Sequence, residues 1–119
     1  MQKVVISEKL AAFHDTWSPK VVGQVNDCAI KLVKLQGEFS WHKHDHEDEL
    51  FLVLHGQMRL LMHDRDITLR EGEFFIVPRG TEHKPVADEE CHVMLIEPSS
   101  TRNTGEITNG FTVKHPETL

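Results

Sequence analysis

The part of this sequence best equipped for chemistry is a run of histidines and carboxylates that precedes an apolar segment. Residues 42–49 hold three histidines and four acidic side chains. Alternate side chains of an extended strand point to the same face, so His42 and His44 would lie side by side. Phe39 and Trp41 would then face away from the histidines and pack outside the cavity that the histidines face. Two neighbouring imidazoles form half of a metal site, so the run predicts metal chemistry.

Two alternatives remain open within this run. Glu49 is in phase with the apolar residues at 51 and 53, and Asp48 with those at 50 and 52. Strand phase therefore favours Glu49 as a carboxylate ligand but leaves Asp48 in competition. His46 shares a face with His44 and competes as an imidazole ligand. We favour the pair His42 and His44, because acidic neighbours on both sides of His46 mark it as a solvent-side corner.

The rest of the chain consists of short apolar segments separated by turn residues. Turn signals recur about every 8–12 residues, which is typical of an all-β sandwich or barrel. Helical periodicity is nearly absent after residue 20, and the acidic residues 88–90 are expected to form a solvated loop. The expected strands are residues 21–25, 28–35, 39–44, 49–54, 58–62, 67–69, 73–77 and 91–97.

The two ends of the chain differ from this barrel, which we place at residues 21–98. Residues 1–20 predict an N-terminal arm with a short helix, capped by Ser7 and ended by Pro19. Its apolar face would either cover one sheet as a lid or reach a second subunit. Residues 99–119 are polar and predict a surface tail, in which a last short strand at 111–113 could dock. The apolar face of the arm would be formed by Leu10, Phe13, His14 and Trp17.

Length and composition indicate one ordinary globular domain over residues 1–119. The formal net charge is −6, with 13 basic and 19 acidic residues. Nucleic acids and anionic membranes reward a basic face, so neither is expected as a partner. Cys28 and Cys91 are not in a Cys-x-x-Cys spacing, and charges arrive too early in the N-terminus for a signal peptide. We therefore expect a cytoplasmic protein with reduced thiols.

Glycines frame the histidine run and a second run further along the chain. Gly37 lies before the His-x-His pair at 42–44, Glu49 follows the pair, and Gly56 closes the run. The second run begins at Gly72 and continues through Pro78-Arg79-Gly80 to His83.

Together these runs resemble the two motifs of the cupins, a superfamily of small barrels. The resemblance is close over residues 37–98 and implies a double-stranded β-helix, or jelly-roll barrel. It extends to small single-domain bacterial cupins described as conserved-barrel or mannose-6-phosphate-isomerase-like. There are two departures: four residues instead of about five separate Gly37 from His42, and Ala87 stands where the family usually has Asn, which is not a ligand.

The resemblance carries the family's metal ligands onto His42, His44, Glu49 and His83. The glycines at 56, 72 and 80 would supply tight turns, and Pro78 would turn His83 back into the barrel. Three imidazoles and a carboxylate suit one divalent Mn, Fe, Co, Ni, Cu or Zn ion, whereas Ca²⁺ prefers more oxygens. Four protein ligands would leave an octahedral ion two exchangeable positions.

Three classes of function fit this expectation. The protein could be a metal-dependent enzyme, such as an oxygenase or an isomerase, or a non-catalytic binder of a small, sugar-like molecule. It could also hold the metal for stability alone. No general acid or base stands out beyond the ligands, so the sequence does not choose a reaction. A homodimer is expected, because small barrels commonly pair their edge strands.

Overall fold

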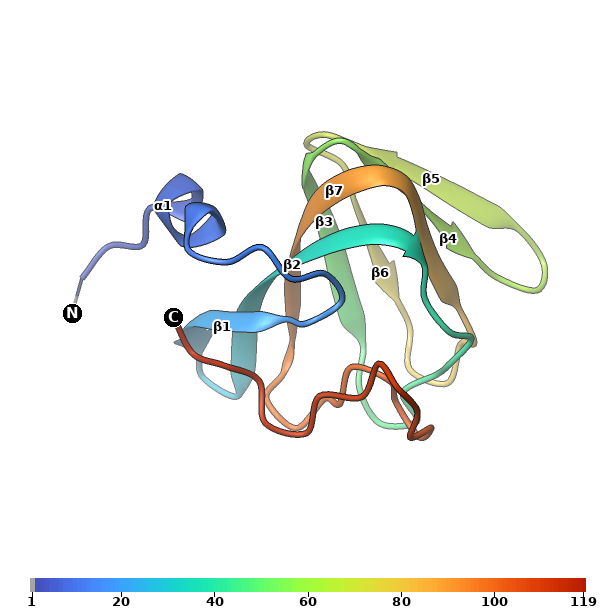
Figure 1. Ribbon diagram of the computed structural model, residues 1–119. Helices are drawn as coiled ribbons and strands as arrows, with labels where there is room; N and C mark the ends of the chain where they lie inside the picture. Colours follow the sequence, from blue (N-terminus) through green and yellow to red (C-terminus); the bar gives the residue numbers. More distant parts are fainter. Residues whose placement is uncertain (1) are drawn as a thin grey trace.

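The computed structural model, described for residues 2–119, confirms an all-β fold with a short N-terminal helix (Figure 1). All strand pairs within the sheet are antiparallel. The elements in chain order are α1 (Ile6–Ala11), β1 (Lys20–Val25), β2 (Cys28–Glu38), β3 (Glu49–His55), β4 (Gln57–Leu61), β5 (Asp66–Arg70), β6 (Phe74–Val77) and β7 (Lys84–Pro98).

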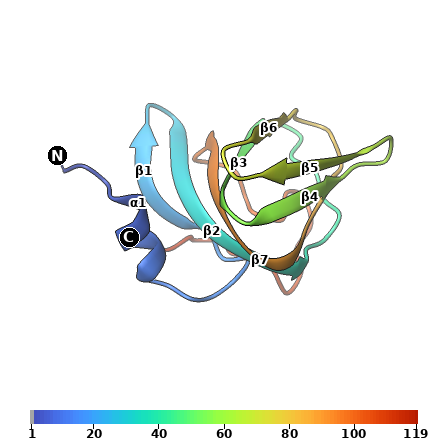
Figure 2. The same ribbon diagram turned by 90° about the horizontal axis from the view of Figure 1, so that it is seen from above.

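The long strand β7 joins the two sides of the barrel. It pairs with β2 along most of its length, with β3 through its second half and with β4 through its first residues. The strand order is β1-β2-β7-β3-β6, with the β4–β5 hairpin attached through β7. Seen from above, the strands curl around a common interior (Figure 2). A strand that serves both sides in this way is what closes a jelly roll.

The interior is filled by alternate residues of the central strands. Phe51 and Val53 of β3 are buried together with Val93 and Leu95 of β7, while their sequence neighbours are only partly buried. Glu49 continues the inward phase of β3, as the sequence predicted. Burial of this apolar surface is the main stabilising contribution to the fold, at about 25 cal/mol per Å². It also provides the rigid wall from which Glu49 projects.

The N-terminal helix is shorter than predicted. It begins at Ile6 with Val5 at the N-cap and has no side-chain cap, so the prediction that Ser7 caps the helix is wrong. It ends at Ala11, well before Pro19, so the proline is not what ends it. Trp17 consequently lies outside the helix, on a separate turn.

The arm packs on the outer face of the sheet as a lid. Phe13 is buried against Val22 and Leu32. The Lys34 ammonium donates hydrogen bonds to the carbonyl oxygens of Leu10, at 2.8 Å, and Phe13, at 2.6 Å. These bonds satisfy one carbonyl in the last turn of α1 and one in the segment that follows the helix.

Three local predictions about strands and loops are wrong. Residues 39–44 do not form a strand, because pairing of β2 with β7 is irregular near Gly37 and β2 ends at Glu38. Residues 88–90 lie within β7 instead of a loop, since a strand can expose charged side chains while its backbone stays paired. Residues 111–113 are not a strand, and the C-terminal contact with β1 is made by Thr118 instead.

The C-terminal residues after β7 are not simply a surface tail. Thr101 and Thr104 are buried, and Gly105 packs directly on the backbone of Lys43. This segment therefore supports the loop that carries the histidine pair. No helix in residues 2–119 is long and apolar enough to cross a membrane. Cys28 and Cys91 are both free thiols.

Candidate metal centre

The structure brings the four side chains singled out in the sequence into one buried cluster. His42 and His44 lie in the loop between β2 and β3, Glu49 is the first residue of β3, and His83 immediately precedes β7. One potential ligand atom from each lies within 4.8 Å of the others. None of the four residues is more than 3 % exposed. A buried group of three imidazoles and a carboxylate could hold a metal ion.

Backbone hydrogen bonds between the two loops set the positions of the histidines. His42 and His83 form an isolated antiparallel bridge, with N–H to O distances of 3.0 and 2.9 Å. The N–H of Gly80 donates to the carbonyl of His44 at 2.8 Å. Gly80 can reach this position because its φ of 81° is one that residues with a side chain rarely adopt. Thus His42 and His44 point inward because they pair with the second loop, and not because they share a regular strand.

Two of the imidazoles have a fixed tautomer. Nδ1 of His42 donates to the carbonyl of Ser40 at 3.0 Å, and Nδ1 of His83 donates to the carbonyl of Thr81 at 2.9 Å. A carbonyl oxygen can only accept, so each Nδ1 carries the proton. In a neutral ring Nε2 then carries the lone pair, and this arrangement is the one that orients histidine ligands for a metal.

The atoms that face one another in the cluster have no hydrogen-bond partner. His44 Nε2 and His83 Nε2 lie 3.2 and 3.3 Å from Glu49 Oε1, which is ion-pair distance. All three atoms are nevertheless buried without a hydrogen bond of acceptable geometry. Unpartnered buried polar atoms are costly, and a lone pair facing a carboxylate oxygen is repulsive. A cation between these atoms would remove both costs, so the residues present fit a metal ion.

The charges of the cluster also suit a cation. Burial would raise the pKa of Glu49, but the close approach of the His44 and His83 imidazoles, and of Glu97, holds it well below its usual range. Burial, together with the nearby His83 imidazole, lowers the pKa of His42 to about 4. At neutral pH the cluster therefore presents an ionised carboxylate and, at His42, a neutral imidazole.

The alternatives left open by the sequence lie outside the cluster. Asp48 is exposed, and its Oδ1 accepts a hydrogen bond from the backbone N–H of Arg79 at 2.8 Å. Its role is to hold the turn that precedes His83. His46 is exposed as well. The other histidines lie at the surface, with His92 half-buried: His14, His55, His63, His92 and His115.

Sequence reasoning missed a second buried polar pair beside the cluster. Lys31 of β2 and Glu97 of β7 point into the barrel, with Nζ and Oε1 3.0 Å apart. Burial and the negative charge of Glu49 raise the pKa of Glu97 well above its usual range, although Lys31 opposes this shift. The available signal was phase, because Glu97 continues the inward series of Val93 and Leu95.

The prediction that Phe39 packs outside the cavity is wrong. Its ring lies edge-on to His42, with centroids 5.3 Å apart, because residues 39–44 are not a strand and do not alternate. Phe39 instead lines a pocket that reaches His42 and Glu49 from outside. Trp41 does face away from the cluster, and its ring stacks on His63.

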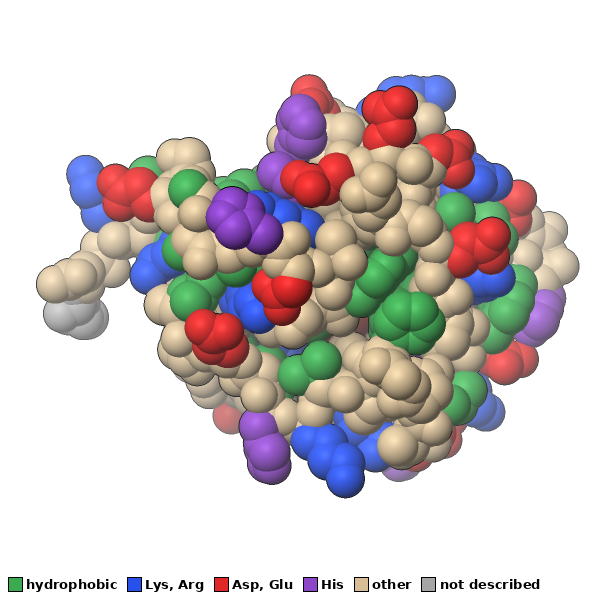
Figure 3. Space-filling model, in the orientation of Figure 1, with side chains coloured by type: hydrophobic (Ala, Val, Ile, Leu, Met, Phe, Trp, Pro, Cys, Tyr) green, Lys and Arg blue, Asp and Glu red, His purple; other side chains and the backbone are tan. Residues whose placement is uncertain are grey.

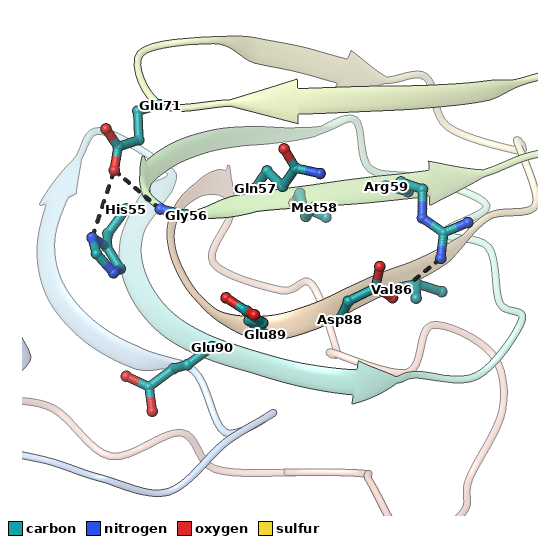
Figure 4. A pocket seen from close by; sticks show the side chains of 10 residues that line it. All are labelled: His55, Gly56, Gln57, Met58, Arg59, Glu71, Val86, Asp88, Glu89 and Glu90. Atoms are coloured by element: carbon teal, nitrogen blue, oxygen red, sulfur yellow. Dashed lines mark hydrogen bonds and ion pairs between the residues drawn. The ribbon is translucent and has the colours of Figure 1, made fainter.

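A larger pocket, of ≈ 510 Å³, lies elsewhere and includes none of the four cluster residues (Figure 4). It lies between the β3–β4 turn and the exposed acidic residues 88–90 of β7. Most of its charges are paired at the surface, as in the contacts of Glu71 with His55 and of Arg59 with Asp88. Exposed pairs of this kind contribute little energy and leave no orphaned donor or acceptor. The buried cluster, which has unpartnered polar atoms, is therefore the better candidate for the functional site.

Comparison with known proteins matches residues 31–97 to the family described as Cupin domain. A cupin-2 domain containing protein from Shewanella frigidimarina is 45 % identical, with 80 % of this chain and 93 % of that chain covered and a TM-score of 0.79. Protein NMB1881 from Neisseria meningitidis is 31 % identical, with 82 % and 100 % covered and a TM-score of 0.76. The uncharacterized protein YdbB of Bacillus subtilis is 34 % identical over 82 residues, which are 68 % of this chain and 70 % of YdbB.

Proposed function

The chain belongs to the cupin family, and from that premise we propose that it is a metal-dependent protein acting on a small molecule in its barrel. His42, His44, Glu49 and His83 are the proposed ligands of one divalent transition metal, drawn from Mn, Fe, Co, Ni, Cu and Zn. The observation that carries the proposal is the set of buried, unpartnered atoms on His44, Glu49 and His83 that face one another.

A bound ion would supply Lewis acidity and an anchor for a small molecule. The chain itself supplies the rest of the site. Ser40 and Thr81 fix the rings of His42 and His83 through their carbonyls, and burial excludes water from the ligand atoms. The apolar pocket beside His42 and Glu49 gives a small molecule access to the ion. Oxygenase and isomerase chemistry are both compatible with this arrangement.

Binding without catalysis is the second candidate. Among the described residues that line the pocket, only His42 and Glu49 are titratable, and both are assigned to the metal. No separate proton donor or acceptor side chain of these residues borders the pocket, so a bound molecule could be held without being transformed. Turnover of a bound molecule by the metal-loaded protein would exclude this candidate.

Elemental analysis of protein purified without a histidine tag tests the proposed site. We expect about one divalent ion per chain, located by an anomalous-scattering map between the four side chains. His83→Ala should lose the ion while the β-sheet circular dichroism spectrum is retained. His55→Ala is the matched control, because His55 is exposed on the β3–β4 turn and should not affect metal content. Full metal occupancy in His83→Ala would contradict the assignment.

We further propose that the chain works as one domain and as a homodimer. Lys34 of β2 donates hydrogen bonds to the arm, and Gly105 of the C-terminal segment packs on the histidine loop. Both ends of the chain therefore pack on the barrel, as expected of a single domain. Phe74 and Ile76 of the edge strand β6 are 59 % and 48 % exposed. Apolar side chains on an exposed edge favour pairing with a second copy.

A further inference from the structure

The pocket that leads to the metal cluster is almost entirely apolar. Trp17, Phe39, Phe51 and Leu95 line it, and His42 and Glu49 lie at its inner end. The space-filling view shows hydrophobic side chains gathered near the centre of this face, with few charged groups among them (Figure 3). Because the inner end carries the metal ligands, this lining meets whatever molecule approaches the ion.

Apart from the proposed metal ligands, this pocket offers a polar molecule few hydrogen-bond partners. Glu49 is the only Asp, Glu, Lys or Arg among the described residues that line it. The side chain of Asn103 is already used: its amide donates to the carbonyl of Phe111 at 2.7 Å, and its oxygen accepts from the N–H of Val113 at 2.8 Å. A phosphate or a polyhydroxyl ligand would therefore be buried without compensating hydrogen bonds.

Trp17 and Phe39 of the pocket wall belong to a cluster of aromatic rings that Phe111 completes without lining the pocket itself. Trp17 stacks on Phe39 with centroids 4.8 Å apart, and Phe111 packs against Phe39 at 4.9 Å. Two hydrogen bonds hold Trp17 on β2, from its N–H to the carbonyl of Lys34 and from its indole N–H to the carbonyl of Gln36. The φ of Trp17 is 61°, which is a strained value for a bulky residue. Strained backbone of this kind is concentrated at ligand-binding and active sites.

We propose that the molecule held at this centre carries an aromatic ring, which packs against Trp17 and Phe39 while a donor atom of the same molecule reaches the metal. This inference rests on the metal site proposed above. Rigid aromatic walls favour a flat ring through offset or edge-to-face packing. The free space of ≈ 30 Å³ is too small for such a ring, so the rim must open. Movement of Phe111 would free Trp17 and Phe39 to shift, since it packs against both, is 37 % exposed and lies outside any helix or strand.

The test compares two probes that share one metal-binding group. Benzohydroxamate and acetohydroxamate differ in a phenyl ring against a methyl group, and glucose 6-phosphate serves as the phosphorylated polar probe. Each is titrated calorimetrically into the protein loaded with Co²⁺, whose visible spectrum reports binding at the metal. We expect benzohydroxamate to bind at least about tenfold more tightly than acetohydroxamate, and glucose 6-phosphate not to bind detectably.

Two substitutions test whether the phenyl ring of benzohydroxamate contacts Trp17 and Phe39. Phe39→Leu and Trp17→Leu keep an apolar side chain but remove the aromatic wall, so each should reduce the advantage of benzohydroxamate by about threefold or more. The Co²⁺ content of each variant, measured by elemental analysis, checks that the metal site is intact, so the comparison rests on the ratio of the two affinities. Ile107→Ala is the control, because it removes an exposed apolar side chain from the same C-terminal segment as Phe111.

The outcomes separate this inference from the function on which it rests. A chain that takes up no metal contradicts the proposed function, whichever probe it binds. A metal-loaded chain that binds the two hydroxamates within about twofold of each other overturns the aromatic ligand alone. The aromatic ligand is also overturned if glucose 6-phosphate binds as tightly as benzohydroxamate, or if neither Phe39→Leu nor Trp17→Leu changes the ratio.

Discussion

His42 makes the metal-free protein sensitive to acid. Its pKa is lowered from 6.5 to about 4 in the folded chain, chiefly by burial. Between these two values the unfolded chain binds a proton that the folded chain does not, so stability falls as the pH falls. The loss begins as the pH drops below 6.5 and is complete near 4.

We expect the free energy of unfolding of the EDTA-treated protein to be about 2 kcal/mol lower at about pH 5 than at about pH 7 through this residue. Urea unfolding of the protein and of His42→Asn at both pH values measures it. The variant should lose most of this pH dependence, because asparagine does not titrate. An equal pH dependence in both proteins would show that burial of His42 is not the source.

The pair of Lys31 and Glu97 gives a second prediction for single residues. Glu97→Leu leaves the Lys31 ammonium buried with only the carbonyl of Thr101, at 3.4 Å, as a partner among the described residues. Leaving a buried ammonium without its partner costs about 3–5 kcal/mol, whereas replacing both polar residues by apolar ones is often nearly neutral. Lys31→Met/Glu97→Leu should therefore be more stable than Glu97→Leu alone. Chemical unfolding of both variants measures the difference, and equal stabilities would contradict it.

The loop that carries His42 and His44 depends on the segment after β7. A Cβ atom added at Gly105 would lie 2.0 Å from the carbonyl oxygen of Lys43, and Gly105 has a φ of 62°. Gly105→Ala must therefore displace one of the two segments. We expect a loss of about 1–3 kcal/mol in stability, as for other overpacked sites, together with weaker metal binding.

Gly110→Ala is the matched control for this prediction. A Cβ atom at Gly110 meets nothing within 4 Å, so the control should keep both stability and metal affinity. Thermal unfolding and competition with a coloured chelator measure the two quantities. If Gly105→Ala keeps the metal affinity of the control, the C-terminal segment does not position the histidine loop.

Strands and ligand candidates differ in how well the sequence predicts them. The apolar phase of β3 predicted that Glu49 points inward, because period-two alternation follows directly from strand geometry. The orientation of Phe39 was mispredicted by the same rule, since residues 39–44 are held by bonds to a loop that lies far along the chain. Lys31 and Glu97 were missed because their pairing follows from the register of β2 against β7, and two strands so far apart in the sequence do not reveal that register.

At the scale of the whole molecule, the sheet leaves one apolar edge uncovered. The arm and the C-terminal residue Leu119 cover the outer face over β1 and β2. β6 ends the strand order on the other side, where Phe74 and Ile76 are exposed. Because its backbone has a free edge and its side chains are apolar, β6 is the face that we expect two copies to share.

Ile76→Asp should therefore convert a dimer into a monomer, because a buried, unpaired carboxylate at an interface is strongly unfavourable. Light scattering coupled to size-exclusion chromatography measures the mass, which should fall from about twice the chain mass of 13.7 kDa to about once that value. Val25→Asp is the control, since Val25 is a similarly exposed apolar residue at the end of β1. Metal content should be unchanged in both variants, as neither position touches the cluster. A dimer that survives Ile76→Asp would place the interface elsewhere, and a monomeric parent protein would exclude the dimer altogether.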